Sequence, residues 1–175
     1  MKLLNAWILI LSVCLCSCIN DDRDLSPTGE NLSVGDKIPQ FQIDLFIPDS
    51  LDWRVSSLSS STLSTPCITV NSNDLRGKRV YLLFFNTTCK DCQKEFPEVQ
   101  SLYEKVRSDS NYVFMAVARE QGREAIEEYW KQNGLTLPYS EQNDRRIYNL
   151  FATQNIPLLY VIDEDGIINE RHFGF

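Results

Sequence analysis

The segment VYLLFFNTTCKDCQKEF, residues 80–96, joins a continuous apolar run to two cysteines and the start of a helical pattern. The run at residues 80–85 is bounded by polar residues, as in a central strand that is buried on both faces. Apolar side chains then recur at helical spacing, which predicts a helix over residues 90–106. Cys89 and Cys92 are therefore expected where a buried strand meets the amino terminus of a helix.

This placement of Cys89 and Cys92 has a chemical consequence. Two thiols on the first turn of a helix are close enough to form a disulfide, and the helix dipole with its unpaired N–H groups favours the thiolate form of Cys89. Because a thiolate is the nucleophile in thiol–disulfide exchange, the pattern predicts redox chemistry. The main alternative is a metal site, although structural zinc sites usually present a second close pair of ligands. Its candidate ligands would be Cys67, Cys89, Cys92 and the only histidine, His172.

The remaining domain alternates between strand and helix patterns, and a serine- and threonine-rich stretch at 56–66 is predicted to be a loop. Strand, helix, strand and then a β-hairpin predict an α/β fold, an α+β sandwich with a mixed sheet. The further elements expected are strands near 41–45, 69–70, 112–118 and 158–162, helices near 125–130 (ended by Gly134) and 147–151, and a hairpin strand from 167.

Length and charge limit the classes of function. With 175 residues, 43% of them hydrophobic, the chain is long enough for one domain with a core. A formal net charge of −7 argues against nucleic acid as a partner and against an electrostatic hold on anionic lipid. Three of the six cysteines lie within the first 18 residues, so the cysteines do not form the evenly spread set of a disulfide-stapled fold.

The amino-terminal stretch has the features of a targeting segment. Residues 1–17 resemble a secretory signal peptide, with a positive start and an apolar run too short to span a membrane comfortably. The sequence LCSC at 15–18 resembles a bacterial lipobox, which makes Cys18 the expected acylated residue. Residues 18–33 are then an acidic, polar tether and 34–175 the predicted domain. These features predict a lipid-anchored protein of the cell envelope, on the periplasmic or surface face of the outer membrane of a Gram-negative bacterium. A plain signal peptide with incidental cysteines is the alternative.

Residues 34–175 resemble the TlpA/ResA group of thioredoxin-like, membrane-tethered thiol–disulfide oxidoreductases, within the wider AhpC/TSA and thioredoxin-like superfamily. The resemblance implies a thioredoxin-like fold, with a central mixed sheet flanked by helices and an amino-terminal β extension. The motifs that carry it are GDKIP at 35–39, LRGK at 75–78, CKDCQKEFP at 89–97, NIP at 155–157 and DEDG at 163–166.

The same resemblance implies roles for individual residues. Cys89 would be the attacking thiol and Cys92 the resolving one, while the Ile156–Pro157 peptide bond would be cis and lie against them. Glu95 matches the acidic residue that ResA-like members keep three positions after the second cysteine, although a solvated helix charge is the alternative. The implied function is disulfide exchange with protein substrates, as a reductase supplied with electrons by a membrane partner, and without a bound cofactor.

The sequence also departs from that family. Thr88 replaces the usual aromatic residue before the first cysteine, and Leu158 follows the proline where threonine is common. The sequence ends at Phe175, where the family continues into a final helix, so that helix is expected to be missing.

Two other functions remain open. One is a peroxiredoxin-like thiol peroxidase, although Asn86 stands where that class has threonine or serine. The other is a non-enzymatic copper or zinc carrier using Cys89, Cys92 and His172.

Overall fold

The computed structural model describes residues 31–48 and 66–174 of the chain. The predicted signal peptide at 1–17, the expected acylation site Cys18, most of the predicted tether and nearly all of the predicted 56–66 loop lie outside these ranges. Within the described ranges, no helix is both long enough and apolar enough to cross a membrane.

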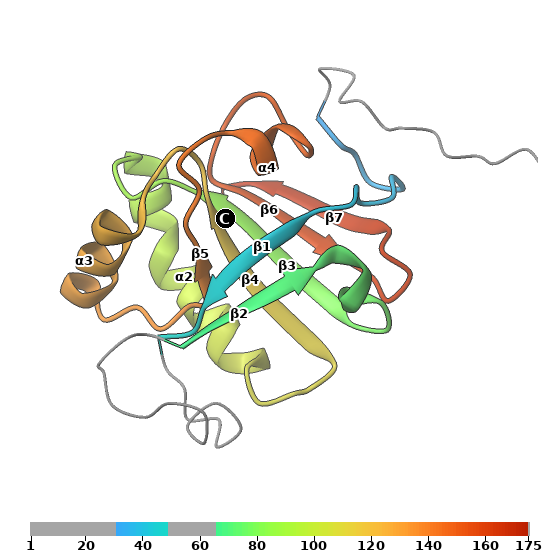
Figure 1. Cartoon of the computed structure of the whole chain (residues 1–175), viewed down its shortest axis with the longest axis horizontal. Coiled ribbons are helices and arrows are strands. Elements are labelled where there is room, and N and C mark those ends of the chain that lie inside the picture. The colour runs from blue at the N-terminus through green and yellow to red at the C-terminus, as the bar shows by residue number, and fades with distance from the viewer. Residues whose placement is uncertain (1–30, 49–65, 175) are drawn as a thin grey trace, which may run out of the picture.

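Seven strands form one mixed sheet in the order β2-β1-β5-β4-β3-β6-β7 (Figure 1). Strand β3 is parallel to β4 and antiparallel to β6, so it has a partner on each side. The strands are β1 (Gln42–Phe46), β2 (Cys67–Asn71), β3 (Arg79–Phe85), β4 (Tyr112–Ala118), β5 (Tyr139–Ser140), β6 (Leu158–Ile162) and β7 (Ile168–Phe173). The helices are the 3-10 helix η1 (Ser72–Leu75), α2 (Lys90–Val106), α3 (Arg123–Asn133) and α4 (Arg146–Asn149).

The two faces of the sheet carry separate hydrophobic clusters, because successive side chains of a strand point to opposite faces. Along β3, Leu82 and Phe84 belong to the cluster that includes α4, whereas Leu83 and Phe85 belong to the cluster that includes α2 and α3. All four of these side chains are buried. The continuous apolar run of β3 is thus explained by burial on both faces, as predicted.

The helices and strands that flank the cysteines have the predicted positions. Strands β4 and β6 and helix α2 occupy the expected ranges, and α3 ends at Gly134, whose φ of 65° is the left-handed conformation that favours glycine. Strands β1 and β2 pair antiparallel and form the expected amino-terminal β extension. The short helix predicted near 147–151 is found as α4, whereas the sequence did not predict β5. Within the described ranges, no helix follows β7.

The last part of the predicted tether, residues 31 and 32, contacts the body of the predicted domain. The backbone N–H of Leu32 donates to the carbonyl of Phe151 at 2.7 Å, and the side chain of Leu32 packs against the α4-side cluster. Asn31 Oδ1 accepts a hydrogen bond from the N–H of Thr153 at 2.8 Å. Residues 31 and 32 therefore belong to the domain body, and a single leucine in a polar stretch was too weak a signal to show it.

Candidate active site

The two thiols lie at the start of α2 and differ in exposure. Cys89 is the N-cap of the helix, and its Sγ accepts a hydrogen bond from the backbone N–H of Cys92 at 3.5 Å. Cys89 is half-buried, whereas Cys92 is only 1% exposed and packs in the α2-side cluster. Both are free thiols in this structure. Of these two sulfurs, that of Cys89 is the one accessible to a partner molecule.

Burial raises the pKa of the Cys92 thiol far above its ordinary value. A backbone hydrogen bond from Asn86 and the positive charge of Arg119 act in the opposite direction but do not cancel the effect of burial. In the reduced protein Cys92 therefore keeps its proton.

A loop between α4 and β6 forms the other side of the site. The Ile156–Pro157 peptide bond is cis, as the resemblance implied, and the Cys89 thiol donates to the carbonyl of Ile156 at 3.6 Å. The sheet register explains the contact, because Phe84 at the end of β3 pairs with Leu158 at the start of β6. The segments that follow β3 and precede β6 must therefore meet at the same edge of the sheet.

A network of side-chain amides holds the loop between β3 and α2. Gln121 Oε1 accepts from the backbone N–H of Thr87 at 2.9 Å, and its Nε2 donates to Thr87 Oγ1. Gln93 Nε2 donates to the Thr87 carbonyl at 2.7 Å. Thr87 and Gln121 are both buried, so these hydrogen bonds replace the bonds to water that the polar groups of Thr87 would otherwise make. The position of Cys89 thus depends on a residue from beyond β4.

Asn86 occupies the position where a peroxiredoxin would carry threonine or serine. Its Oδ1 accepts from the N–H of Thr88 at 2.9 Å and from Thr88 Oγ1 at 2.7 Å, and its Nδ2 donates to the Arg119 carbonyl at 3.0 Å. The Asn86 side chain thus shapes the loop, and its contacts are with backbone and hydroxyl groups rather than with the Cys89 sulfur. This arrangement gives no support to the peroxidase alternative.

Glu95 lies one turn after Cys92 on α2 and is half-buried. A Cβ atom built on Gly174 would lie 3.6 Å from Glu95 Oε1, which places this carboxylate against the chain that leaves β7. Positions three apart share a helix face, so Glu95 and Cys92 are on the same side of α2. The structure thus keeps Glu95 near the thiols, next to the end of β7.

The four ligands of the alternative metal site are not assembled. The described ranges contain no group of three or more histidine, cysteine or acidic side chains able to hold a metal ion. His172 is exposed on β7 and hydrogen-bonds Glu170 Oε2 at 2.9 Å. Cys67 is exposed on β2, which is four strands away from β3 in the sheet, or about 19 Å at the usual strand spacing. Cys67 is therefore also too distant to resolve a disulfide with Cys89.

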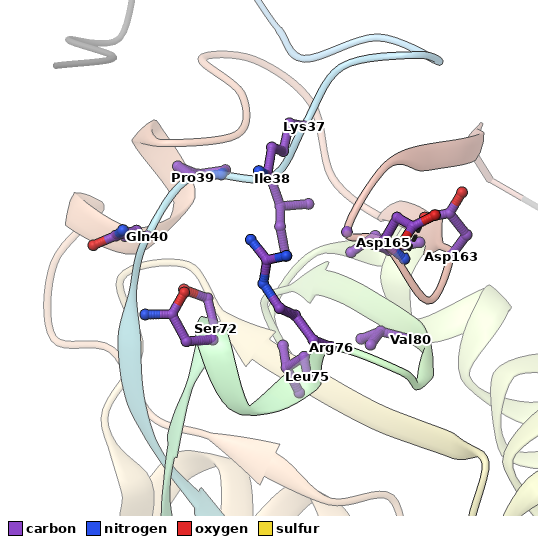
Figure 2. A pocket seen from close by; sticks show the side chains of 13 residues that line it. Lys37, Ile38, Pro39, Gln40, Ser72, Leu75, Arg76, Val80, Asp163 and Asp165 are labelled. Carbon is purple, nitrogen blue, oxygen red and sulfur yellow. Dashed lines mark hydrogen bonds between the residues drawn. The ribbon is translucent and has the colours of Figure 1, made fainter. Parts of the chain in front are cut away.

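A small cavity of about 90 Å³ lies at the opposite end of β3 (Figure 2). It is lined by Val80 near the start of β3, by Ile162 at the end of β6, and by charged side chains that include Lys37, Arg76 and Asp163. Because Cys89 follows the other end of β3, this cavity is separate from the thiol site.

Comparison with known proteins places the chain in a family. Residues 77–168, more than half of the chain, match the thioredoxin-like family, and the chain belongs to that family. The matched part includes Cys89, Cys92, Glu95 and Pro157.

Individual relatives agree with this assignment. The chain is 30% identical over 105 residues to the thiol-disulfide oxidoreductase ResA of Bacillus thuringiensis, a match that covers 60% of each protein. The chain thus spans less than two thirds of the length of the curated relatives that it matches.

Two solved structures show the fold. The thioredoxin domain of a thiol-disulfide oxidoreductase from Bacteroides vulgatus has a TM-score of 0.61 at 19% identity, covering 83% of this chain and 91% of that one. AhpC of Mycobacterium tuberculosis has a TM-score of 0.62 at 17% identity, covering 82% and 83%. At these identities the likeness concerns the fold alone, and it confirms the expected thioredoxin-like architecture.

Three side chains at the site were not identified from the sequence. Arg119 and Gln121 lie in the segment between β4 and α3 and Tyr148 lies on α4, and none is in a motif or at a diagnostic spacing. Arg119 follows β4, and its positive charge partly opposes the rise in the pKa of Cys92 that burial causes. A glutamine or an arginine after a buried strand is ordinarily a surface residue, so no sequence signal could have distinguished these two.

Proposed function

We propose that this protein is a thiol–disulfide oxidoreductase that exchanges a disulfide with protein substrates through Cys89 and Cys92. The observation that carries the proposal is the asymmetry of the pair, with Cys89 accessible at the helix N-cap and Cys92 protonated and buried behind it. The thioredoxin-like family and the similarity to the thiol-disulfide oxidoreductase ResA support it.

The reaction uses only sulfur and protons. The Cys89 thiolate attacks one sulfur of a substrate disulfide, which forms a mixed disulfide and releases the other substrate sulfur as a thiolate. Cys92 then loses its proton and attacks the Cys89 sulfur, which releases the second substrate thiol. The substrate gains two electrons, and the protein is oxidised to a Cys89–Cys92 disulfide. This scheme needs no bound cofactor.

Trapping of the mixed disulfide tests these roles. The Cys92→Ala variant lacks the resolving thiol and should accumulate mixed disulfides with substrate proteins, seen as dithiothreitol-sensitive bands on non-reducing gels. Cys89→Ala should trap none, and Cys67→Ala should behave like the wild type. Trapping by Cys89→Ala, or full insulin-reducing turnover by Cys92→Ala, would contradict the assignment.

For the direction of exchange, we propose a reductase. A reductase requires a pair whose oxidised form is the more stable, with a potential near the thioredoxin value of about −270 mV, whereas a strong oxidant lies near about −120 mV. Equilibration of the reduced protein with glutathione buffers measures this potential. A potential near about −120 mV would instead make the protein an oxidant.

For the location, we propose a lipid-anchored protein of the cell envelope, with Cys18 acylated and a membrane protein as electron donor. The support is the lipobox-like sequence before Cys18, and multiple acyl chains anchor stably because each buried methylene contributes about 0.8 kcal/mol. Cys18→Ala should abolish the incorporation of labelled fatty acid, whereas Cys16→Ala should retain it. Unchanged labelling of Cys18→Ala would show that the lipoprotein prediction is wrong.

A further inference from the structure

Tyr148 on α4 is joined by a hydrogen bond to the loop that faces Cys89. It is fully buried, and its hydroxyl donates to the carbonyl of Asn155 at 2.8 Å. Asn155 immediately precedes the Ile156–Pro157 pair, and the Ile156 carbonyl accepts the Cys89 thiol hydrogen bond. One phenol group therefore lies a single residue away from the carbonyl that contacts the reactive sulfur.

Aromatic and cationic neighbours fix the ring of Tyr148. Phe84 packs edge-on at 5.3 Å between ring centroids. The guanidinium carbons of Arg119 and Arg145 each lie 5.3 Å from the Tyr148 ring centroid, within the range of a cation–π contact. Arg145 also donates to the Thr153 carbonyl at 2.9 Å, which ties the same loop to the start of α4.

The backbone at Asn155 has an uncommon conformation. Its φ of 69° is in the left-handed region, which asparagine adopts more readily than most residues with a side chain, although still at a cost. A conformation of this kind persists when neighbouring contacts hold it, and the Tyr148 hydroxyl supplies one at the Asn155 carbonyl. Without that hydrogen bond, the loop would sample other conformations and the Ile156 carbonyl would lose its fixed place beside Cys89.

We propose that Tyr148 is a positioning residue for substrate binding, because its hydroxyl holds segment 155–157 in the conformation that forms one wall of the thiol site. The inference rests on the proposed function, in which a substrate disulfide approaches Cys89 along this wall. Cys89 contacts this wall through a weak hydrogen bond from its thiol, 3.6 Å long, so loss of the Tyr148 hydroxyl should act mainly on substrate binding and little on the reactivity of Cys89.

Tyr160 provides a matched control. It is also fully buried in the α4-side cluster, and its hydroxyl donates to the carbonyls of Phe151 and Leu32 at 3.0 and 3.3 Å. Tyr148→Phe and Tyr160→Phe each remove one buried hydroxyl from the same cluster. Only Tyr148→Phe removes a hydrogen bond to the Asn155 carbonyl. Both variants should lose similar unfolding free energy, so a difference between them reports on the loop.

The first measurement is hydrogen–deuterium exchange of the peptide that covers residues 153–158 in the reduced protein. Tyr148→Phe should accelerate this exchange by about fivefold relative to Tyr160→Phe, as expected for the loss of one neutral hydrogen bond. Equal exchange in the two variants would overturn the positioning role, whatever the activity of the protein.

The second measurement is insulin reduction with dithiothreitol as electron donor, in parallel with alkylation of Cys89 by iodoacetamide. Tyr148→Phe should raise the KM for insulin by about fivefold and leave the alkylation rate within about twofold of wild type. Faster loop exchange with an unchanged KM would overturn the role in substrate binding. If the wild type reduces no insulin while loop exchange still differs, the proposed function fails and Tyr148 only holds the loop.

Discussion

Cys89 and Cys92 are three positions apart, yet they face different environments. As the N-cap, Cys89 has non-helical backbone angles that leave its sulfur at the helix end, next to the free N–H groups of the first turn. Cys92 is inside the helix and on its apolar face, where it packs in the α2-side cluster. Cys89 and Cys92 therefore differ in exposure because the helix begins at Lys90, directly after Cys89.

We propose that Glu95 takes part in the thiol chemistry, because it lies on the same face of α2 as Cys92. Its carboxylate is half-buried on the same helix face as Cys92, and a nearby negative charge opposes the formation of a thiolate. Glu95→Gln should therefore change the pH dependence of thiol alkylation and slow disulfide exchange while the fold is preserved. Stopped-flow alkylation of the reduced protein between about pH 5 and pH 10 measures this profile.

The exposed Glu98 on the same helix is the matched control for Glu95. Glu98→Gln removes an equal charge from α2, so it should leave the alkylation profile unchanged. If Glu95→Gln gives the same profile as wild type and Glu98→Gln, then Glu95 is a solvated helix charge and has no part in the chemistry.

At the scale of elements, the site is a junction between loops that three parts of the sheet supply. The loop from β3 to α2 carries Cys89, the loop from α4 to β6 carries Pro157, and the segment after β4 contributes Gln121. Gln121 joins the first and third of these, since its amide bonds both the backbone and the hydroxyl of Thr87. The start of α2 is thus positioned by side-chain contacts as well as by its own capping.

Replacement of Gln121 by leucine should weaken this junction. The change leaves the buried N–H and hydroxyl of Thr87 without partners, and an unsatisfied buried polar group costs about 1 to 3 kcal/mol. We expect Gln121→Leu to lower the free energy of unfolding by about that amount in urea denaturation. Gln132→Leu, an exposed glutamine on α3, should have little effect, and an equal loss in the two variants would contradict the role of Gln121.

At the scale of the whole molecule, buried tyrosine hydroxyls and the buried Cys92 thiol make the stability of the protein depend on pH. Burial raises the pKa of the Cys92 thiol, and it raises the pKa of Tyr160 to about 12. For such groups the folded state holds its proton after the unfolded chain has lost it. Their contribution to stability is present at neutral pH and is lost as the pH rises above the unfolded value, which is 9.0 for the thiol.

The reduced protein should therefore lose stability from about pH 9 upward, and Cys92→Ala should lose it less steeply. The difference in slope is at most about 1.4 kcal/mol per pH unit, the value for one proton. Urea unfolding in the presence of a reductant, repeated from neutral pH to about pH 11, provides the curves. Val99→Ala, a buried change on the same helix without a titrating group, should shift the curve without altering its slope. Parallel curves for wild type and Cys92→Ala would contradict this linkage.

The sequence by itself determined the central strand, the cysteine-bearing helix and the strands β4 and β6. Each of these elements is long and strongly patterned, so its hydrophobic period is set locally by the face that it buries. The resemblance to the TlpA/ResA group also implied the cis bond at Pro157 correctly. The two-residue strand β5 and the attachment of Leu32 had no comparable signal, because an element of one or two residues shows no period.

Only the tertiary structure decided which distant residues meet at the thiols. The parallel and antiparallel pairings of β3 bring the ends of β3 and β4 and the start of β6 to one edge, and that edge unites Cys89, Gln121 and the Ile156 carbonyl. The same sheet order places Cys67, on β2, four strands from β3 and away from the pair of cysteines. Contacts between residues far apart in the chain depend on strand order and register, and these follow from the packing of all elements together, because no local stretch of sequence specifies its partner.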